Sequence, residues 1–283
     1  DARGGAVYAR GGAFLFESTI SGSVVHSAGG PADGGGLYSP GSVMAMYSIF
    51  RNNTASNDSG SGFGGAAFLS GNASIVASTI HGNTADNVGG LVLIGSNATG
   101  NLTIKNSTIT DNYGSASSFG AGAYLGSDAV VSNSTITGNT EANANDTKYG
   151  AGLSAKYGTT IELRSTIVSG NVLFDGNVSL PSDIGAAAGA EPPTLTGSNN
   201  LLGASASTTP ADTLATADPR LEPLDSNGGP TPTMAPLTGS LAFNAGTGSD
   251  DYDQRGPGYP RLVGAGVDIG AFESDALFID GFD

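Results

Sequence analysis

The chain has 283 residues, including 46 Gly and 13 Pro but no Cys and no Trp. Its 10 Lys and Arg against 25 Asp and Glu give a net charge of -15, which argues against nucleic-acid binding because that role requires a cationic surface. The lack of Cys excludes disulfides, thiolate zinc sites and cysteine nucleophiles, and no apolar stretch is long enough to span a bilayer as a helix.

The start of the chain, residues 1–13, does not have the basic start followed by an apolar run that is typical of an export signal. An acidic, polar and Cys-free composition is nevertheless typical of secreted bacterial proteins. We therefore interpret the chain as a mature form or fragment of a secreted bacterial protein, located extracellularly at the cell surface or in the matrix. A cytosolic protein is the alternative interpretation.

A repeat runs through residues 1–180. Each unit contains Ser-Thr-Ile or a variant of it, and the isoleucines are separated by 29, 31, 29, 27 and 31 residues. A pair of small residues precedes each isoleucine and begins a short apolar segment. The isoleucines are Ile20, Ile49, Ile80, Ile109, Ile136 and Ile167.

The units contain short runs in which apolar and polar residues alternate, and Gly separates these runs, which indicates strands rather than helices. One unit of ~29 residues cannot bury its own apolar side, whereas stacked units can, at about 4.8 Å per rung. The sequence therefore predicts an all-β fold, a right-handed parallel β-helix with about six regular rungs whose isoleucines face inward. A globular sandwich is the alternative, but it does not explain the constant spacing.

An Asn follows the isoleucine by three or four residues in five of the units. Asn tolerates the left-handed conformation of a corner, and its amide can bond to the equivalent Asn of the next rung. We therefore predict a structural ladder formed by Asn52, Asn83, Asn112, Asn139 and Asn171.

The Asn-Ser-Thr-Ile-Thr units with Gly-Gly between them resemble the pectate-lyase-like right-handed β-helix superfamily. More specifically, they resemble the repeats of polymorphic outer-membrane proteins. The resemblance covers residues 1–180 and implies the fold. It does not imply one activity, because the superfamily includes lyases, glycosidases, adhesins and inert stalks.

The remainder of the chain, residues 181–283, differs in composition, and its part from 203 to 283 carries 12 acidic and 3 basic residues. Its motifs begin with Ser-Asn-Asn-Leu-Leu-Gly at 198–203 and end with Asp-Ile-Gly-Ala-Phe-Glu at 268–273. Their order is similar to the choice-of-anchor Q module of secreted β-helix proteins, which implies no catalytic residue. We expect irregular rungs and then an acidic cap and tail, with the cap covering the end of the stack.

Few residues are candidates for a catalytic or metal-binding role. Aligned on the isoleucine, the outward columns next to it bring no two carboxylates together, so no catalytic residue is assigned. Asp250, Asp251 and Asp253 form the densest acidic cluster, and hard oxygen ligands at alternate positions suit Ca²⁺, the one cofactor considered. A solvated acidic loop is the alternative.

Apolar residues near both ends of the chain predict a surface for assembly. The first rung has almost nothing before it, and no turn returns the apolar strand at 276–279 to the body, so we expect copies to pair head to tail by strand addition. A fragment, or a tail packed on its own cap, is the alternative. The residues concerned are Val7, Tyr8, Phe14, Phe16, Leu277, Phe278, Ile279 and Phe282.

Together these features favour a non-catalytic structural or adhesive protein of the cell surface or matrix that assembles into filaments. Two alternatives stay open. One is a polysaccharide lyase or glycosidase acting on extracellular glycans, which rests on the resemblance alone, and the other is a glycan-binding module that does not cleave. The expected partners are a second copy of the chain or an extracellular polysaccharide.

Overall fold

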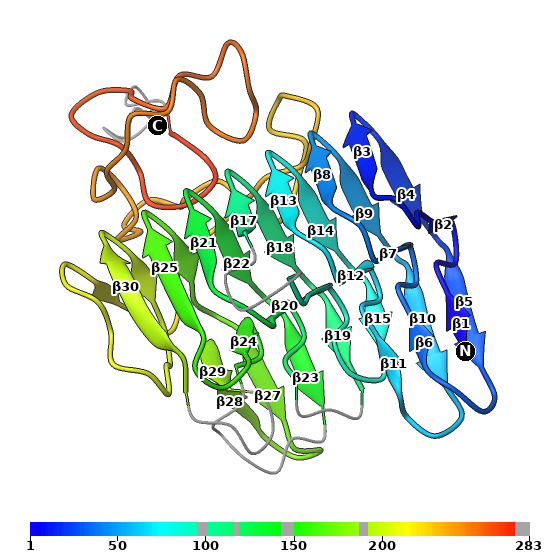
Figure 1. Cartoon of the computed structure of the whole chain (residues 1–283). Helices are drawn as coiled ribbons and strands as arrows, with labels where there is room; N and C mark the ends of the chain where they lie inside the picture. Colours follow the sequence, from blue (N-terminus) through cyan, green and yellow to red (C-terminus); the bar gives the residue numbers. More distant parts are fainter. Residues whose placement is uncertain (96–100, 116–118, 143–149, 187–191, 275–283) are drawn as a thin grey trace.

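A computed structural model of the chain describes residues 1–95, 101–115, 119–142, 150–186 and 192–274. These residues form short strands joined by turns, and none of them belongs to a helix long and apolar enough to cross a membrane. The chain coils repeatedly around one interior, so that strands about 30 residues apart in the sequence lie side by side (Figure 1).

Two sheets, here called C and D, meet at a corner of the coil and carry most of the features described below. Sheet C contains β3 (Ala13–Phe16), β8 (Val43–Met46), β13 (Ala73–Val76), β17 (Leu102–Lys105), β21 (Ala129–Ser132), β25 (Thr160–Arg164) and β30 (Thr194–Ser198). Sheet D contains β4 (Thr19–Ser21), β9 (Ile49–Arg51), β14 (Thr79–His81), β18 (Thr108–Thr110), β22 (Thr135–Thr137), β26 (Ile167–Val168), β31 (Leu201–Leu202) and β32 (Leu214–Ala215).

Three further sheets complete the coil. Sheet B contains β2 (Val7–Tyr8), β7 (Leu37–Ser39), β12 (Ala67–Leu69), β16 (Leu91–Leu93), β20 (Ala123–Leu125), β24 (Leu153–Ala155) and β29 (Ile184–Ala186). Sheet E contains β5 (Val24–Ser27), β10 (Thr54–Asn57), β15 (Thr84–Ala85), β19 (Tyr113–Gly114), β23 (Thr140–Ala142), β27 (Val172–Phe174) and β28 (Ser179–Pro181). Sheet A contains β1 (Ala2–Arg3), β6 (Ala32–Asp33) and β11 (Gly62–Phe63).

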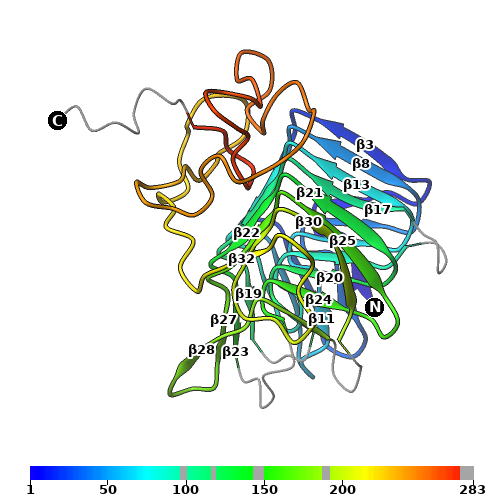
Figure 2. The same ribbon diagram turned by 90° about the vertical axis from the view of Figure 1, so that its left-hand side faces the viewer.

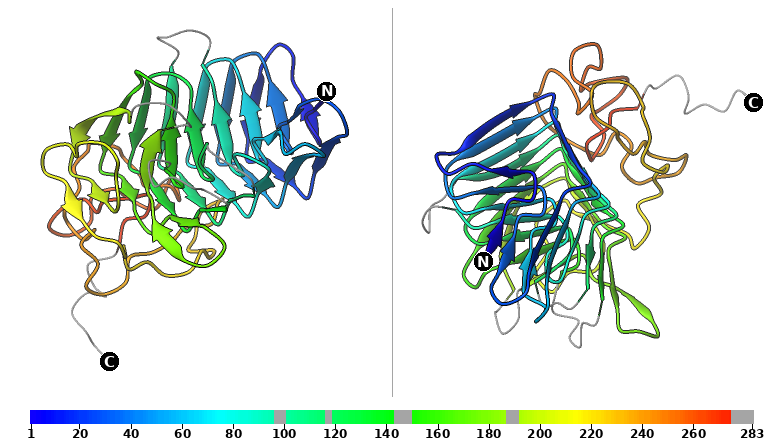
Figure 3. Two further views of the ribbon diagram at one scale, coloured as in Figure 1. Left: turned by 90° about the horizontal axis from the view of Figure 1, so that it is seen from below. Right: turned by 90° about the vertical axis from the view of Figure 1, so that its right-hand side faces the viewer.

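The predicted all-β parallel β-helix is confirmed. Among the described strands of these sheets, every neighbouring pair is parallel except β27 and β28, which form an antiparallel hairpin. About six regular rungs are followed by an irregular one that contains β30 and β31, also as predicted. Seen along the coil axis, the strands of successive rungs lie directly behind one another (Figure 3).

The core consists of the side chains that point inward from each strand. In sheet D, four of the six isoleucines predicted to face inward do so. Ile49 and Ile167 do not, because they lie opposite the outward-facing Thr79 and Thr135. A shift of one residue exchanges the two faces of a strand, and here the next residue is also apolar, so Phe50 and Val168 face inward instead. The complete column is Ile20, Phe50, Ile80, Ile109, Ile136, Val168 and Leu202.

A second column, outward-facing in sheet D, supports residues 217–274, here called the C-terminal segment. Thr79, Thr108 and Thr135, the threonines of three Ser-Thr-Ile units, are buried beneath it. The Gln254 side chain receives a hydrogen bond from the Thr108 hydroxyl (2.7 Å) and donates one to the Thr79 hydroxyl (2.8 Å). The backbone N–H of Ala271 donates to the Thr135 hydroxyl (3.0 Å).

The C-terminal segment therefore lies along the side of the stack and does not cover its end, contrary to the predicted position of the cap. Figures 1 and 2 show it, in orange and red, beside sheet D and above the corner between sheets C and D. The physical reason is that the buried threonine hydroxyls supply hydrogen-bond partners along the flank. Inside the segment, Arg255 pairs with the buried Asp253 (2.6 Å), and burial raises the pKa of Glu273 to about 7.

Candidate functional site

A shallow groove follows the outer face of sheet C. Two depressions, each of about 370 Å³, share Asn101 and Thr103 and together extend from β3 to β30. Because seven parallel strands are crossed at about 4.8 Å per step, the groove is about 29 Å long. It runs along the coil axis, which gives it the shape of a track for an extended chain molecule.

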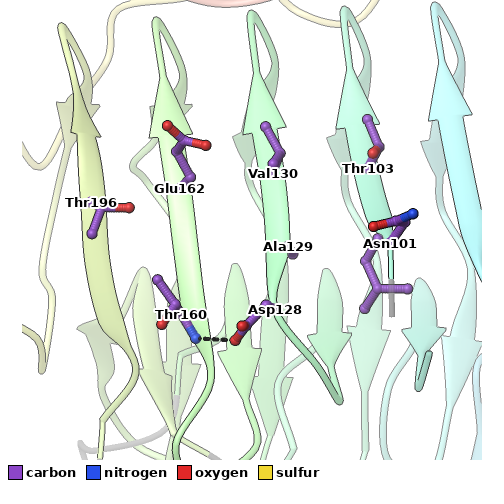
Figure 4. A pocket seen from close by; sticks show the side chains of 9 residues that line it. Asn101, Thr103, Asp128, Ala129, Val130, Thr160, Glu162 and Thr196 are labelled. Atoms are coloured by element: carbon purple, nitrogen blue, oxygen red, sulfur yellow. Dashed lines mark hydrogen bonds between the residues drawn. The ribbon is translucent and has the colours of Figure 1, made fainter. Parts of the chain in front are cut away.

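Strand alternation determines which side chains line the groove. The first residue of most sheet C strands faces the core, so the second residue and the residue before the strand point outward. The residues that follow the first inward position form one row, and Figure 4 shows four of them, Thr103, Val130, Glu162 and Thr196, on adjacent strands. The residues before the first inward position form the other row, which includes Asn72, Asn101, Asp128 and Thr160.

Two carboxylates, Asp128 and Glu162, face the same depression from neighbouring strands (Figure 4). Asp128 accepts a hydrogen bond from the backbone N–H of Thr160 (2.7 Å), and Glu162 accepts one from Nε of Arg164 (2.9 Å). The sequence did not bring these two together, because the columns compared there lie beside the isoleucine of sheet D. A comparison of the residues around the start of each sheet C strand would have revealed both.

The groove becomes apolar towards the first rungs. Phe14 and Met44 occupy its outward row there, and Phe14 is 66% exposed. The next outward row contains Phe16 and Met46, and the rings of Phe14 and Phe16 stack with centroids 6.4 Å apart. Tyr47 contacts Phe16 edge to face. Exposed aromatic rings offer apolar area against which the apolar face of a sugar can pack.

The three aspartates considered for calcium lie where the C-terminal segment meets sheet C. Asp250 is paired with Nζ of Lys105 (2.6 Å) and accepts a hydrogen bond from Asn133 (2.7 Å). Asp253 is paired with Arg255 inside the segment, and Asp251 is exposed. The structure therefore directs these carboxylates to different partners, and within its described residues no three acidic or His side chains gather as a metal site would require.

The asparagine side chains inside the coil form a continuous ladder. In each of the first four members, the amide Nδ2 donates to Oδ1 of the asparagine one rung further along, with distances of 2.8–3.0 Å. Each Nδ2 also donates to a backbone carbonyl of an earlier rung, so the buried amides are satisfied. The members are Asn53, Asn83, Asn112, Asn139 and Asn171.

Asn52 does not belong to this ladder, although the sequence placed it there. It occupies the corner after β9 with a φ of 55°, a position filled by Gly in the first and third rungs, as Gly22 and Gly82 show. The prediction failed because it counted from Ile49 instead of Phe50. The same one-residue correction explains why Asn171 follows Ile167 by four residues but Val168 by three.

The ladder ends on a carboxylate. Oδ1 of Asp183 accepts hydrogen bonds from both the backbone N–H and Nδ2 of Asn171, each at 2.8 Å, and Oδ2 accepts one from the backbone N–H of Ala204 (2.7 Å). Asp183 is fully buried. This desolvation raises its pKa to about 6 despite the three donors.

Four of the residues proposed for assembly are described by the structure, and they lie on β2 and β3 of the first rung. Val7 is half-buried, whereas Tyr8, Phe14 and Phe16 are exposed on β2 and β3. The remaining four lie outside the described residues and are Leu277, Phe278, Ile279 and Phe282. Tyr8 instead continues an aromatic stack over sheet B, where its ring lies 5.3 Å from that of Tyr38.

The comparisons with known proteins agree with the architecture. Residues 1–177 match the family model described as "Right handed beta helix region". Neither the search of curated proteins nor that of solved structures gave a match. The family match ends before the C-terminal segment, so the similarity of residues 181–283 to the choice-of-anchor Q module stays a prediction. Since the match spans more than half of the chain and the rungs are stacked in parallel, this protein belongs to the right-handed β-helix family.

Proposed function

We propose that this β-helix is a non-catalytic, adhesive protein of an extracellular surface or matrix, and that it binds a polysaccharide along the groove of sheet C. The observation that carries the proposal is the outward row over successive strands of sheet C, in which hydrogen-bonding side chains recur between apolar ones. Ser74, Thr103 and Thr196 belong to it, and Asn101 lies beside it. Hydroxyl and amide groups repeated along a linear track match the repeated hydroxyls of an extended glycan.

Binding without cleavage is supported by the contacts of the two carboxylates. Asp128 is fixed by the N–H of Thr160, and Glu162 is paired with Arg164. A hydrolytic pair would need one carboxyl group kept protonated as the acid and one free as the base. These two groups are instead held as hydrogen-bond and ion-pair acceptors.

The test compares polysaccharide binding by the protein and by two double variants. In affinity electrophoresis against neutral and acidic polysaccharides, Asn101→Ala combined with Thr103→Val should weaken binding about tenfold, because each lost hydrogen bond contributes about 0.5–1.5 kcal/mol. The control is Thr54→Ala with Thr84→Ala, which alters outward positions of sheet E. Equal retardation of both double variants, or no retardation of any protein, would refute the proposal.

A glycosidase is the second candidate, favoured by the shared depression of Asp128 and Glu162. Their Cα atoms are separated by one strand step and two residues, about 8 Å, so rotation of the two side chains can reach the roughly 6.5–9.5 Å between carboxyl groups that inverting glycosidases use. Release of reducing ends that disappears in both Asp128→Asn and Glu162→Gln would establish this activity. Unsaturated products detected by ultraviolet absorbance would indicate a lyase.

A further inference from the structure

We infer that the groove of sheet C selects uncharged polysaccharides and rejects polyanionic ones. This inference rests on the proposed function and adds the chemical class of the ligand. It follows from the charges that line the groove, from the partners of its cations, and from the apolar surface at one end.

The cations of sheet C are neutralised by acidic groups of the protein itself. Lys105, on β17, is bound to Asp250 of the C-terminal segment at 2.6 Å. Arg164, on β25, is bound to Glu162 of its own strand. A carboxylate-bearing sugar would have to compete with these attached acids for either cation, so neither cation is available to recognise an anionic polymer.

The two anions of the groove differ in their partners, because Glu162 is paired with Arg164 whereas Asp128 forms no ion pair with a described residue. Asp128 lines the depression over β17 to β30, and its hydrogen bond comes from a neutral backbone N–H. Glu162 lies on the next strand in the same depression. A polymer with a carboxylate on each sugar would bring like charge against Asp128 and would compete with Glu162 for Arg164, and like-charge contact is a direct means of rejecting a ligand. The net charge of -15 adds a repulsive field around the whole molecule.

The remaining surface of the groove suits an uncharged sugar chain. Over the first rungs the outward positions are Phe14, Met44 and Ser74, and further along they are Thr103 and Val130. Such a surface offers apolar contact and neutral hydrogen bonds but no unpaired cation. The groove therefore discriminates by charge over its later strands and by apolar contact over its first strands.

The experiment uses polymers that share a backbone and differ in charge. One pair is highly methyl-esterified homogalacturonan and its free acid, and the other is hydroxyethyl cellulose and carboxymethyl cellulose. Affinity electrophoresis or calorimetry at low ionic strength should show at least tenfold tighter binding of the uncharged member of a pair. This preference should diminish at high salt, because salt screens exposed charges.

The groove is tested separately from the overall charge with two variants of equal net charge. Asp128→Asn combined with Glu162→Gln should bring the ratio of the affinities for the uncharged and the acidic polymer of a pair close to one. Asp58→Asn combined with Glu222→Gln alters two exposed carboxylates outside the groove and should leave the ratio unchanged. A ratio changed equally by both double variants would overturn the assignment to the groove.

The outcomes distinguish a failure of the charge selectivity from a failure of polysaccharide binding itself. Binding of the acidic and uncharged members with equal affinity, or tighter binding of the acidic member, would overturn the inference while leaving polysaccharide binding intact. If the protein binds no polymer of either pair and none in the wider screen, the proposed function itself fails. A preference for the uncharged member that is lost only in the groove variant supports the inference.

Discussion

Asp183 shows how one buried residue can link stability to pH. Its folded-state pKa of about 6 is higher than the ordinary value of 3.8 because burial penalises the charged form. Below pH ~4 the carboxyl group is protonated in both the folded and the unfolded chain. As the pH rises, the unfolded chain releases this proton first, so the free energy of unfolding falls until the folded state also ionises, at about pH 6.

We predict that Asp183→Asn removes this pH-dependent part. A shift from 3.8 to about 6 corresponds to about 3 kcal/mol lost between pH ~4 and ~6, since one pKa unit is about 1.4 kcal/mol. Urea unfolding at several pH values would measure it. Asp212→Asn, at an exposed site, should retain the wild-type profile. An Asp183→Asn profile parallel to that of the wild type would contradict the assignment.

At the scale of the element, the asparagine ladder connects five rungs through buried amides. We predict that Asn112→Ala lowers the free energy of unfolding by about 2–4 kcal/mol, because the buried backbone N–H of Asn83 loses its acceptor and the Ile80 carbonyl and Oδ1 of Asn139 each lose a donor. Denaturant unfolding followed by circular dichroism would measure this change.

The matched control for the ladder is Asn52→Gly. This residue is exposed, and its φ of 55° suits Gly, so we expect a change within about 0.5 kcal/mol. If Asn52→Gly were as destabilising as Asn112→Ala, the distinction between corner and ladder positions would be wrong.

The sequence predicted the fold from its repeat but misplaced two of the six sheet D rungs by one residue. Ser-Thr-Ile identifies the inward column where one apolar residue follows the threonine, as at Ile80 and Ile109. In the second and sixth rungs two apolar residues are adjacent, and only the hydrogen-bonded register decides between them. For example, the N–H of Ser48 donates to the hydroxyl of Ser78, which aligns Phe50 with Ile80.

At the scale of the whole molecule, the C-terminal segment ties several rungs together from outside. Thr108 contacts Gln254, which is 146 residues away in the sequence. No local pattern indicates a contact of that range, so the sequence predicted a terminal cap where the structure has a lateral segment. The groove was missed for a related reason, because its residues come from rungs that adjoin only after coiling.

We predict that Thr108→Val loosens the C-terminal segment. The variant leaves the buried Oε1 of Gln254 without its donor, so the free energy of unfolding should fall by about 1–3 kcal/mol. Limited proteolysis within residues 217–274 should become faster. Thr19→Val is the control, because Thr19 occupies the same column of the first rung but is exposed. Equal proteolysis of both variants would show that the hydroxyl does not secure the segment.

The one-way donation from each asparagine to the next has a consequence for how such a protein can lengthen during evolution. Every internal rung accepts from the preceding side and donates to the following side, so a duplicated rung inserted between two of them would restore the same pairing at both joints. Beyond Asp183 the pattern cannot continue, because an ionised carboxylate has no proton to give. Gain or loss of whole rungs is therefore expected on the amino-terminal side of this aspartate.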